Sequence, residues 1–280
     1  MWLYSGRVDG MSWFRTPASD TQITHGNRIW LYLLATIIML LLVIPTFIVI
    51  PMSFSDSQYL EFPPSTWSTR WYNEYFSSNK WMRATWTSLR IGFLTMLLAT
   101  PIGTMAAYAL YVSGHKAARL IFMFMLTPMI VPVILIAIGV FYFYGKVKLN
   151  NSLSGLVIAH SALAIPLVMI IITAALRSYD LNQERVARSL GATRLKAFFV
   201  ITLPQIKFSV ITAALLSFLT SFDEVIVSIF VSGGKTATLT KHMFSALRDY
   251  IDPTIAAIST IMVLISTVLL LLVQLAGSRE

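Results

Sequence analysis

The residues best suited to bind a solute lie within an apolar segment at positions 208–231. Four polar residues there are spaced by four, three and four positions, which places them on one face of a helix: Ser217, Ser221, Glu224 and Ser228. Thr220 lies beside this face, and Asp223 is about 100° from Glu224 around the axis. Carboxylates are costly in an apolar environment and are functional candidates by default. We interpret the six residues as candidates for contact with a solute; if that solute is a cation, a carboxylate could replace part of the hydration that it loses.

A structural role is the alternative for the same region. Asp223 could form an ion pair with Arg90 instead of contacting a solute. His160 has no second histidine or carboxylate at metal-ligand spacing around it, so we expect it to be packed or hydrogen-bonded. The sequence has no cysteine, which excludes disulfides and thiolate metal sites. No metal site is predicted.

Motifs for catalysis and for nucleotide binding are missing from the sequence. There is no G-x-S-x-G nucleophile motif. The run at 233–236, Gly-Gly-Lys-Thr, imitates the end of a P-loop, but Ile229 holds the place of the first glycine. We therefore expect neither enzyme activity nor a cofactor bound by this chain.

The elements that must position these residues are membrane helices. Hydrophobic residues make up 56% of the chain and charged residues 12%, a composition typical of an integral membrane protein. Six apolar stretches approach the ~20 residues that a helix needs to cross a bilayer. They cover 29–52, 89–112, 120–144, 156–176, 208–231 and 255–275. We predict an all-α fold with a polar N-terminal segment at 1–28 and one six-helix membrane domain at 29–276.

Two of these stretches contain packing signals. Ala99, Gly103 and Ala107 recur every four residues, a spacing that lets helix backbones approach closely in lipid. Pro128 and Pro132 each remove a backbone donor and predict a kink in the third stretch.

Lysine and arginine favour an orientation with both termini in the cytoplasm. In that orientation twelve of these residues fall on cytoplasmic segments and eight on outer segments, with Arg90 in a helix end. The segments around Trp67, Asn151 and Arg248 are then external. Because orientation accounts for the net charge of +9, we expect no nucleic-acid partner.

The connection at 177–207 is long and strongly patterned for a cytoplasmic loop. Asp180 could cap a short helix, with Gln183 in the capping-box position. Gly191 could end that helix in the left-handed conformation, and Thr193 could cap a second one. Pro204 fits the first turn of the next span. The loop is predicted to form a helix–turn–helix.

This loop resembles the EAA signature of permease subunits of binding-protein-dependent ATP-binding-cassette (ABC) importers. The Gly191-Ala192 pair and the Ile-Thr-Leu-Pro run at 201–204 match in type and spacing. The Glu-Ala-Ala triplet of the family aligns with Arg185-Val186-Ala187, and Glu184 lies one position early. Phe208 stands where the family usually has proline.

The resemblance implies the type I ABC importer permease fold and a loop that docks into a groove on the ATPase. Nine residues would form this coupling site: Glu184, Arg185, Val186, Ala187, Arg188, Ser189, Leu190, Gly191 and Ala192. The alternative is a basic amphipathic segment lying on anionic lipid, for which Arg185, Arg188, Arg194 and Lys196 would serve equally well.

The segment from Ser221 to Leu239 looks like the spermidine and putrescine branch of that family. The resemblance implies a multi-pass translocation subunit of the bacterial inner membrane that imports a polyamine or related small organic amine. Its expected partners are an ATPase dimer that binds ATP and Mg²⁺, a second and related permease, an external solute-binding protein and membrane lipid.

The alternative function is a secondary transporter or channel driven by an ion gradient. Only six spans, and no broken-helix halves that repeat across the sequence, argue against it.

Overall fold

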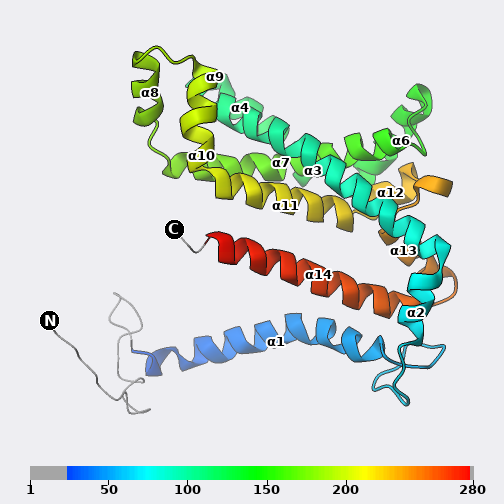
Figure 1. Ribbon diagram of the computed structural model, residues 1–280. Coiled ribbons are helices and arrows are strands. Elements are labelled where there is room, and N and C mark those ends of the chain that lie inside the picture. The colour runs from blue at the N-terminus through cyan, green and yellow to red at the C-terminus, as the bar shows by residue number, and fades with distance from the viewer. Residues whose placement is uncertain (1–23, 278–280) are drawn as a thin grey trace.

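The computed structural model describes residues 24–277, and helices dominate this range (Figure 1). Five helices are long: α1 Ile29–Met52, α3 Asn79–Ser113, α7 Leu153–Ser178, α11 Lys207–Asp223 and α14 Thr254–Gly277. Shorter ones connect them: η2 Gly26–Arg28, α2 Arg70–Ser77, α4 Lys116–Met125, α5 Thr127–Ile130, α6 Val133–Val147, α8 Asn182–Ser189, α9 Arg194–Ala197, the π-helical η3 Phe198–Thr202, α10 Leu203–Gln205, α12 Ile226–Val231, η4 Gly234–Thr236 and α13 Leu239–Asp249.

Three helices, α3, α7 and α11, pack against one another and form the core that positions the candidate sites. The small-residue stripe on α3 permits this packing, as predicted. Ala99 and Ala107 are fully buried, and a Cβ added to Gly103 would lie 2.7 Å from Val168 Cγ1 on α7. A larger side chain at Gly103 would therefore separate α3 from α7.

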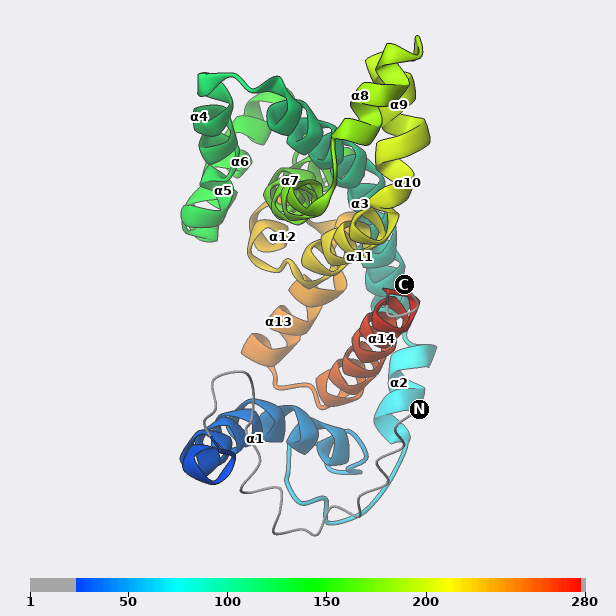
Figure 2. The ribbon, with the colours of Figure 1, turned by 90° about the vertical axis from the view of Figure 1, so that its left-hand side faces the viewer.

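α1 contributes little to this core. None of its residues is buried, and its leucine and isoleucine side chains are largely exposed. Figure 2 shows α1 set apart from the α3–α7–α11 group, with α14 between them. Exposed apolar area of this extent on a helix of 24 residues suits contact with lipid or with another membrane helix.

Four predicted spans lie within single helices, namely α1, α3, α7 and α14. By length and composition, three helices within the described residues could each cross a membrane alone: Gly26–Met52, Asn79–Ser113 and Leu153–Ser178. The N-terminal segment predicted at 1–28 lies mostly outside the described residues.

Two of the six predicted stretches are not single helices. The stretch 120–144 is divided into α4, α5 and α6, and Pro132, which cannot donate a backbone hydrogen bond, precedes α6. The stretch 208–231 is divided into α11 and α12, because the backbone leaves the helical conformation at Glu224, with ψ of 112°. The kink predicted from Pro128 and Pro132 is thus a full break.

The elements are sorted between two ends of the molecule (Figure 1). α8, α9 and the last turns of α14 lie at one end, whereas α2, α13 and the end of α6 lie at the other. All loops predicted to be external are therefore on the side opposite the 177–207 loop.

Candidate functional site

The 177–207 loop folds into the predicted helix–turn–helix. Asp180 Oδ1 accepts the backbone N–H of Asn182 at 2.9 Å, and α8 follows. Gly191 has φ of +92°, and α8 ends in a Schellman motif: Ala192 N–H bonds the Ala187 carbonyl at 3.1 Å and Gly191 N–H bonds the Arg188 carbonyl at 3.0 Å. Local sequence signals alone therefore determine where α8 stops.

A second cap begins α9. The Thr193 hydroxyl accepts the Lys196 N–H at 3.3 Å, as predicted. The capping box expected from Gln183 is wrong, because the Gln183 side-chain oxygen accepts a hydrogen bond from Gln205 Nε2. Gln183 thus links α8 to α10, a contact over 22 positions that no local signal indicates.

The loop continues into the helical core through a sharp bend. α9, η3 and α10 follow one another from Arg194 to Gln205, and this segment is bent by 81° relative to α11. Ile206, at the bend, is buried. If α8 and α9 moved as a rigid body, the bend between α10 and α11 would transmit the movement to α11.

Glu184 fixes α8 to the core. Its carboxylate is 4% exposed and accepts hydrogen bonds from Tyr108 Oη at 2.7 Å and from Thr202 Oγ1 at 3.1 Å. The Thr202 hydroxyl also lies 3.4 Å from Tyr179 Oη. Tyr108 belongs to α3 and Thr202 to η3, so one buried carboxylate joins three elements. Hydrogen bonds to charged groups are roughly twice as strong as neutral ones, which makes this junction a firm attachment.

The opposite face of α8 is open. Val186 is 59% exposed and Leu190 is 84% exposed, and Arg185, Arg188 and Ser189 are also exposed. A Cβ added at Gly191 would meet no atom within 4 Å. Of the nine predicted coupling residues, Glu184 therefore faces inward, whereas the others form or border an exposed surface of apolar and basic character.

The polar stripe of the fifth predicted span is mostly internal. Ser217, Ser221 and Ser228 are 0%, 4% and 0% exposed. Thr220 is half-buried, and Asp223 is exposed and forms no ion pair with Arg90 in the described part of the chain. The prediction of one continuous polar face is wrong, since α11 ends at Asp223 and Ser228 belongs to α12.

Hydrogen bonds from α7 join the two pieces of the broken span. His160 Nδ1 lies 2.9 Å from Ser221 Oγ, and His160 Nε2 lies 3.4 Å from Ser228 Oγ. Ser221 Oγ is also 3.3 Å from Thr95 Oγ1 on α3. The expectation of a hydrogen-bonded His160 is confirmed, and its ring bridges α11 and α12.

Glu224 occupies the break itself. Its Oε1 accepts the Val227 N–H at 2.9 Å and so caps the first turn of α12. Its carbonyl oxygen accepts hydrogen bonds from Ser228 Oγ at 3.0 Å and Thr240 Oγ1 at 3.1 Å. Glu224 as a whole is only partly buried.

Sequence reasoning missed Tyr108 and Thr202, the two residues whose hydroxyl groups donate hydrogen bonds to Glu184. Tyr108 follows the small-residue stripe of α3 and carries no motif of its own. Thr202 occupies the variable position of the Ile-x-Leu-Pro run. Only the tertiary fold brings their hydroxyl groups to Glu184.

Comparisons with known proteins agree with this architecture. Residues 99–279 match the family described as "Binding-protein-dependent transport system inner membrane component". The putrescine transport system permease protein PotI of Escherichia coli strain K12 is 33% identical over 202 residues, covering 70% of this chain and 72% of PotI. The spermidine/putrescine permease PotC of Haemophilus influenzae is 30% identical over 240 residues, covering 85% of this chain and 93% of PotC.

A solved structure has the same fold. A chain of a bacterial ABC transporter involved in the import of alginate superposes with a TM-score of 0.67 at 15% sequence identity, covering 92% of this chain and 98% of the other. On the family match and these relatives, the chain belongs to the inner membrane components of binding-protein-dependent transport systems, the permease subunits of ABC importers.

Proposed function

We propose that this permease imports a polyamine or a related small organic amine, and that the α8–α9 loop couples its helices to an ATPase dimer. The observation that carries the coupling role is the two-sided character of α8. Its inner side is tied to α3 and η3 through Glu184, and its outer side exposes Val186 and Leu190. A helix that is hydrogen-bonded to the core on one side and exposed on the other is suited to transmit movement from a docked partner to that core.

The membrane arrangement that we propose has six spans with both termini in the cytoplasm. α4 to α6 together would form the third span, and α11 with α12 the fifth. The placement of α2 and α13 opposite α8 and α9 supports this orientation (Figure 1). ATP and Mg²⁺ would be bound by the ATPase dimer. A related second permease, an external solute-binding protein and membrane lipid complete the proposed set of partners.

The solute path would follow the stripe of Ser217, Thr220, Ser221, Asp223, Glu224 and Ser228. Glu224 and Asp223 retain exposed surface, whereas the buried Ser221 and Ser228 are hydrogen-bonded to His160 on either side of the break. A carboxylate at a helix break can take the place of water around an amine. The names of the relatives, which are putrescine and spermidine permeases, support an amine as solute.

Purification of the chain from its native membrane tests this function. We expect an ATPase, a second permease and ATP-dependent uptake of radiolabelled putrescine or spermidine into vesicles that contain the solute-binding protein. Uptake that depends on an ion gradient, with no ATPase in the complex, would refute the proposal.

A further inference from the structure

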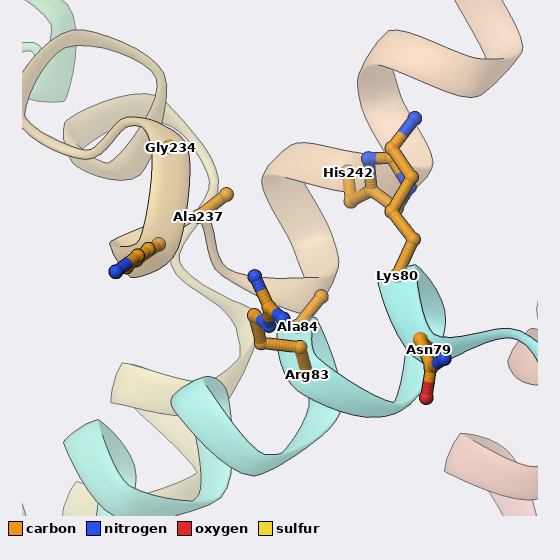
Figure 3. Close-up of a pocket in the computed structure, with 8 residues that line it drawn as sticks. Asn79, Lys80, Arg83, Ala84, Gly234, Ala237 and His242 are labelled. Carbon is orange, nitrogen blue, oxygen red and sulfur yellow. The ribbon is translucent and has the colours of Figure 1, made fainter.

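A basic groove lies where the first turns of α3 meet η4 and α13 (Figure 3). Its deeper part has a volume of about 300 Å³ and is lined by Lys80, Arg83, Lys235 and His242 among others. An adjoining hollow of about 590 Å³ shares Arg83 and Lys235 and adds Arg90. In Figure 3 the side chains of Lys80 and His242 lie next to each other, and Arg83 projects between them and the segment of Gly234 and Ala237. We use the term basic groove for Lys80, Arg83, Arg90 and Lys235.

Among the residues that the structure describes, no acidic side chain lines either hollow. The four side chains of the basic groove are exposed, and within the described residues none of them forms a hydrogen bond or an ion pair. α3 has no acidic residue in its first turn, where the helix dipole is already positive. Lys80, Arg83 and Arg90 lie on the N-terminal part of α3 and Lys235 lies on η4, and these like charges line two adjoining hollows. Their mutual repulsion is unfavourable in an isolated subunit, so an anionic group is the expected occupant.

The pKa of His242, which lines the deeper part of the groove, reflects the positive charge of Lys80. Burial lowers the pKa of His242, the charge of Lys80 lowers it further, and Asp252 opposes both effects. The Trp81 ring packs on His242 with a centroid separation of 4.3 Å. A bound anion would counter the effect of Lys80 and raise the pKa of His242.

The occupant differs from the proposed solute, because a polyamine is a cation and would be repelled by the basic groove. The groove also lies at the α2–α13 end, opposite α8 and α9 (Figure 1), which is external in the proposed orientation. We propose that the basic groove is the docking site for acidic side chains of the external solute-binding protein. This inference rests on the proposed function, since it needs an external partner on that face.

The chemistry of the groove suits a protein surface. Arginine forks bind carboxylates in two-point geometry, and Arg83 and Arg90 lie on either side of Trp86, which is 60% exposed. Arginine and tryptophan are enriched among residues that dominate binding energy at interfaces. Clustered charge also steers an acidic partner and accelerates its association, with strong dependence on salt.

The test uses the complete transporter in phosphatidylcholine nanodiscs and its cognate solute-binding protein. The double substitution Arg83→Gln with Lys235→Gln should weaken binding at least about tenfold and flatten its salt dependence. The matched control, Lys146→Gln with Lys148→Asn, removes two exposed charges from the end of α6 and should leave binding unchanged. Hydrolysis of ATP without the solute-binding protein should be unchanged in both variants.

A carbodiimide crosslink identifies the occupant directly, because it joins a lysine amine to a carboxylate. Mass spectrometry should find Lys80 or Lys235 linked to an aspartate or glutamate of the solute-binding protein. Crosslinks only to another membrane subunit, unchanged affinity of the double variant, or a loss seen only in nanodiscs with anionic lipid would overturn the assignment. If the wild-type complex contains no ATPase and binds no solute-binding protein, the proposed function itself fails.

Discussion

Tyr108 and Glu184, which are 76 positions apart, form a buried hydrogen bond of 2.7 Å that attaches the short helix α8 to the long helix α3. The carboxylate has a second donor, Thr202, in the π-helical segment that leads to α11. The α8–α9 loop is therefore held at its base and exposed at its tip. If a partner docks on the exposed part of the loop, as proposed, its movement would reach α3 and η3 through the Glu184 carboxylate.

Removing the Tyr108 hydroxyl should loosen α8. Tyr108→Phe leaves a buried carboxylate with one remaining donor, and loss of a hydrogen bond to a charged group costs about 1.5–3 kcal/mol. We expect lower thermal stability of the complex and a fall in solute imported per ATP hydrolysed. Tyr111→Phe on the same helix is the control, because Tyr111 is only partly buried and makes no such bond to α8. Equal effects of the two substitutions would refute the attachment.

The His160 bridge predicts an order of severity between two serines. Ser221 lies 2.9 Å from Nδ1 and Ser228 lies 3.4 Å from Nε2, so the first hydrogen bond is the stronger. Ser221→Ala should lower the free energy of unfolding by about 1–2 kcal/mol more than a neutral surface substitution, and Ser228→Ala by less. Thermal melts of the purified complex measure both. The reverse order would contradict the bridge as described.

Glu224 has two separable roles, a cap on α12 and a charge at the break. Glu224→Gln keeps an oxygen that can accept the Val227 N–H but removes the charge. Uptake of a cationic solute should fall while assembly is retained. Glu224→Leu removes the cap as well and should also lower stability by about 1 kcal/mol. Normal uptake by the Gln variant would leave Glu224 with a structural role only.

Gly191 tests whether the angle after α8 matters for coupling. Its φ is +92°, and nothing lies within 4 Å of an added Cβ, so Gly191→Val carries backbone strain of about 1–2 kcal/mol without a steric clash. Gly114 is the matched control, since its φ is +61° and its surroundings are equally open. Both valine variants should lose similar stability. Only in the complex that contains Gly191→Val should the ATPase hydrolyse ATP without transport of solute. Uncoupling by both would assign the effect to strain alone.

Much of the fold follows from local signals in the sequence. Apolar length predicted α1, α3, α7 and α14, and the spacing of Ala99, Gly103 and Ala107 predicted the face of α3 that packs on α7. Gly191 and Thr193 predicted the end of α8 and the start of α9, because each acts through its own backbone or its nearest turns.

The remaining features depend on contacts between distant segments. The break after Asp223 is stabilised by Thr240 and His160, and hydropathy gives no sign of it because α11 and α12 are both apolar. Gln183 fitted a capping box locally, but the fold places Gln205 within its reach. Glu184 was likewise predicted as part of the docking site for the ATPase. In the fold it is buried, because Tyr108 on α3 and Thr202 on η3 donate hydrogen bonds to it.

The most direct test of the account is a crosslink from the tip of α8 to the ATPase. Leu190 is 84% exposed, and the chain has no native cysteine, so Leu190→Cys offers one defined attachment point for a short thiol-reactive photocrosslinker. We expect a crosslinked product with the ATPase subunit in the purified complex, and none when cysteine replaces Ser65 at the opposite end. A product from Ser65→Cys but not from Leu190→Cys, or crosslinks from Leu190→Cys to lipid alone, would contradict the coupling role of the α8–α9 loop.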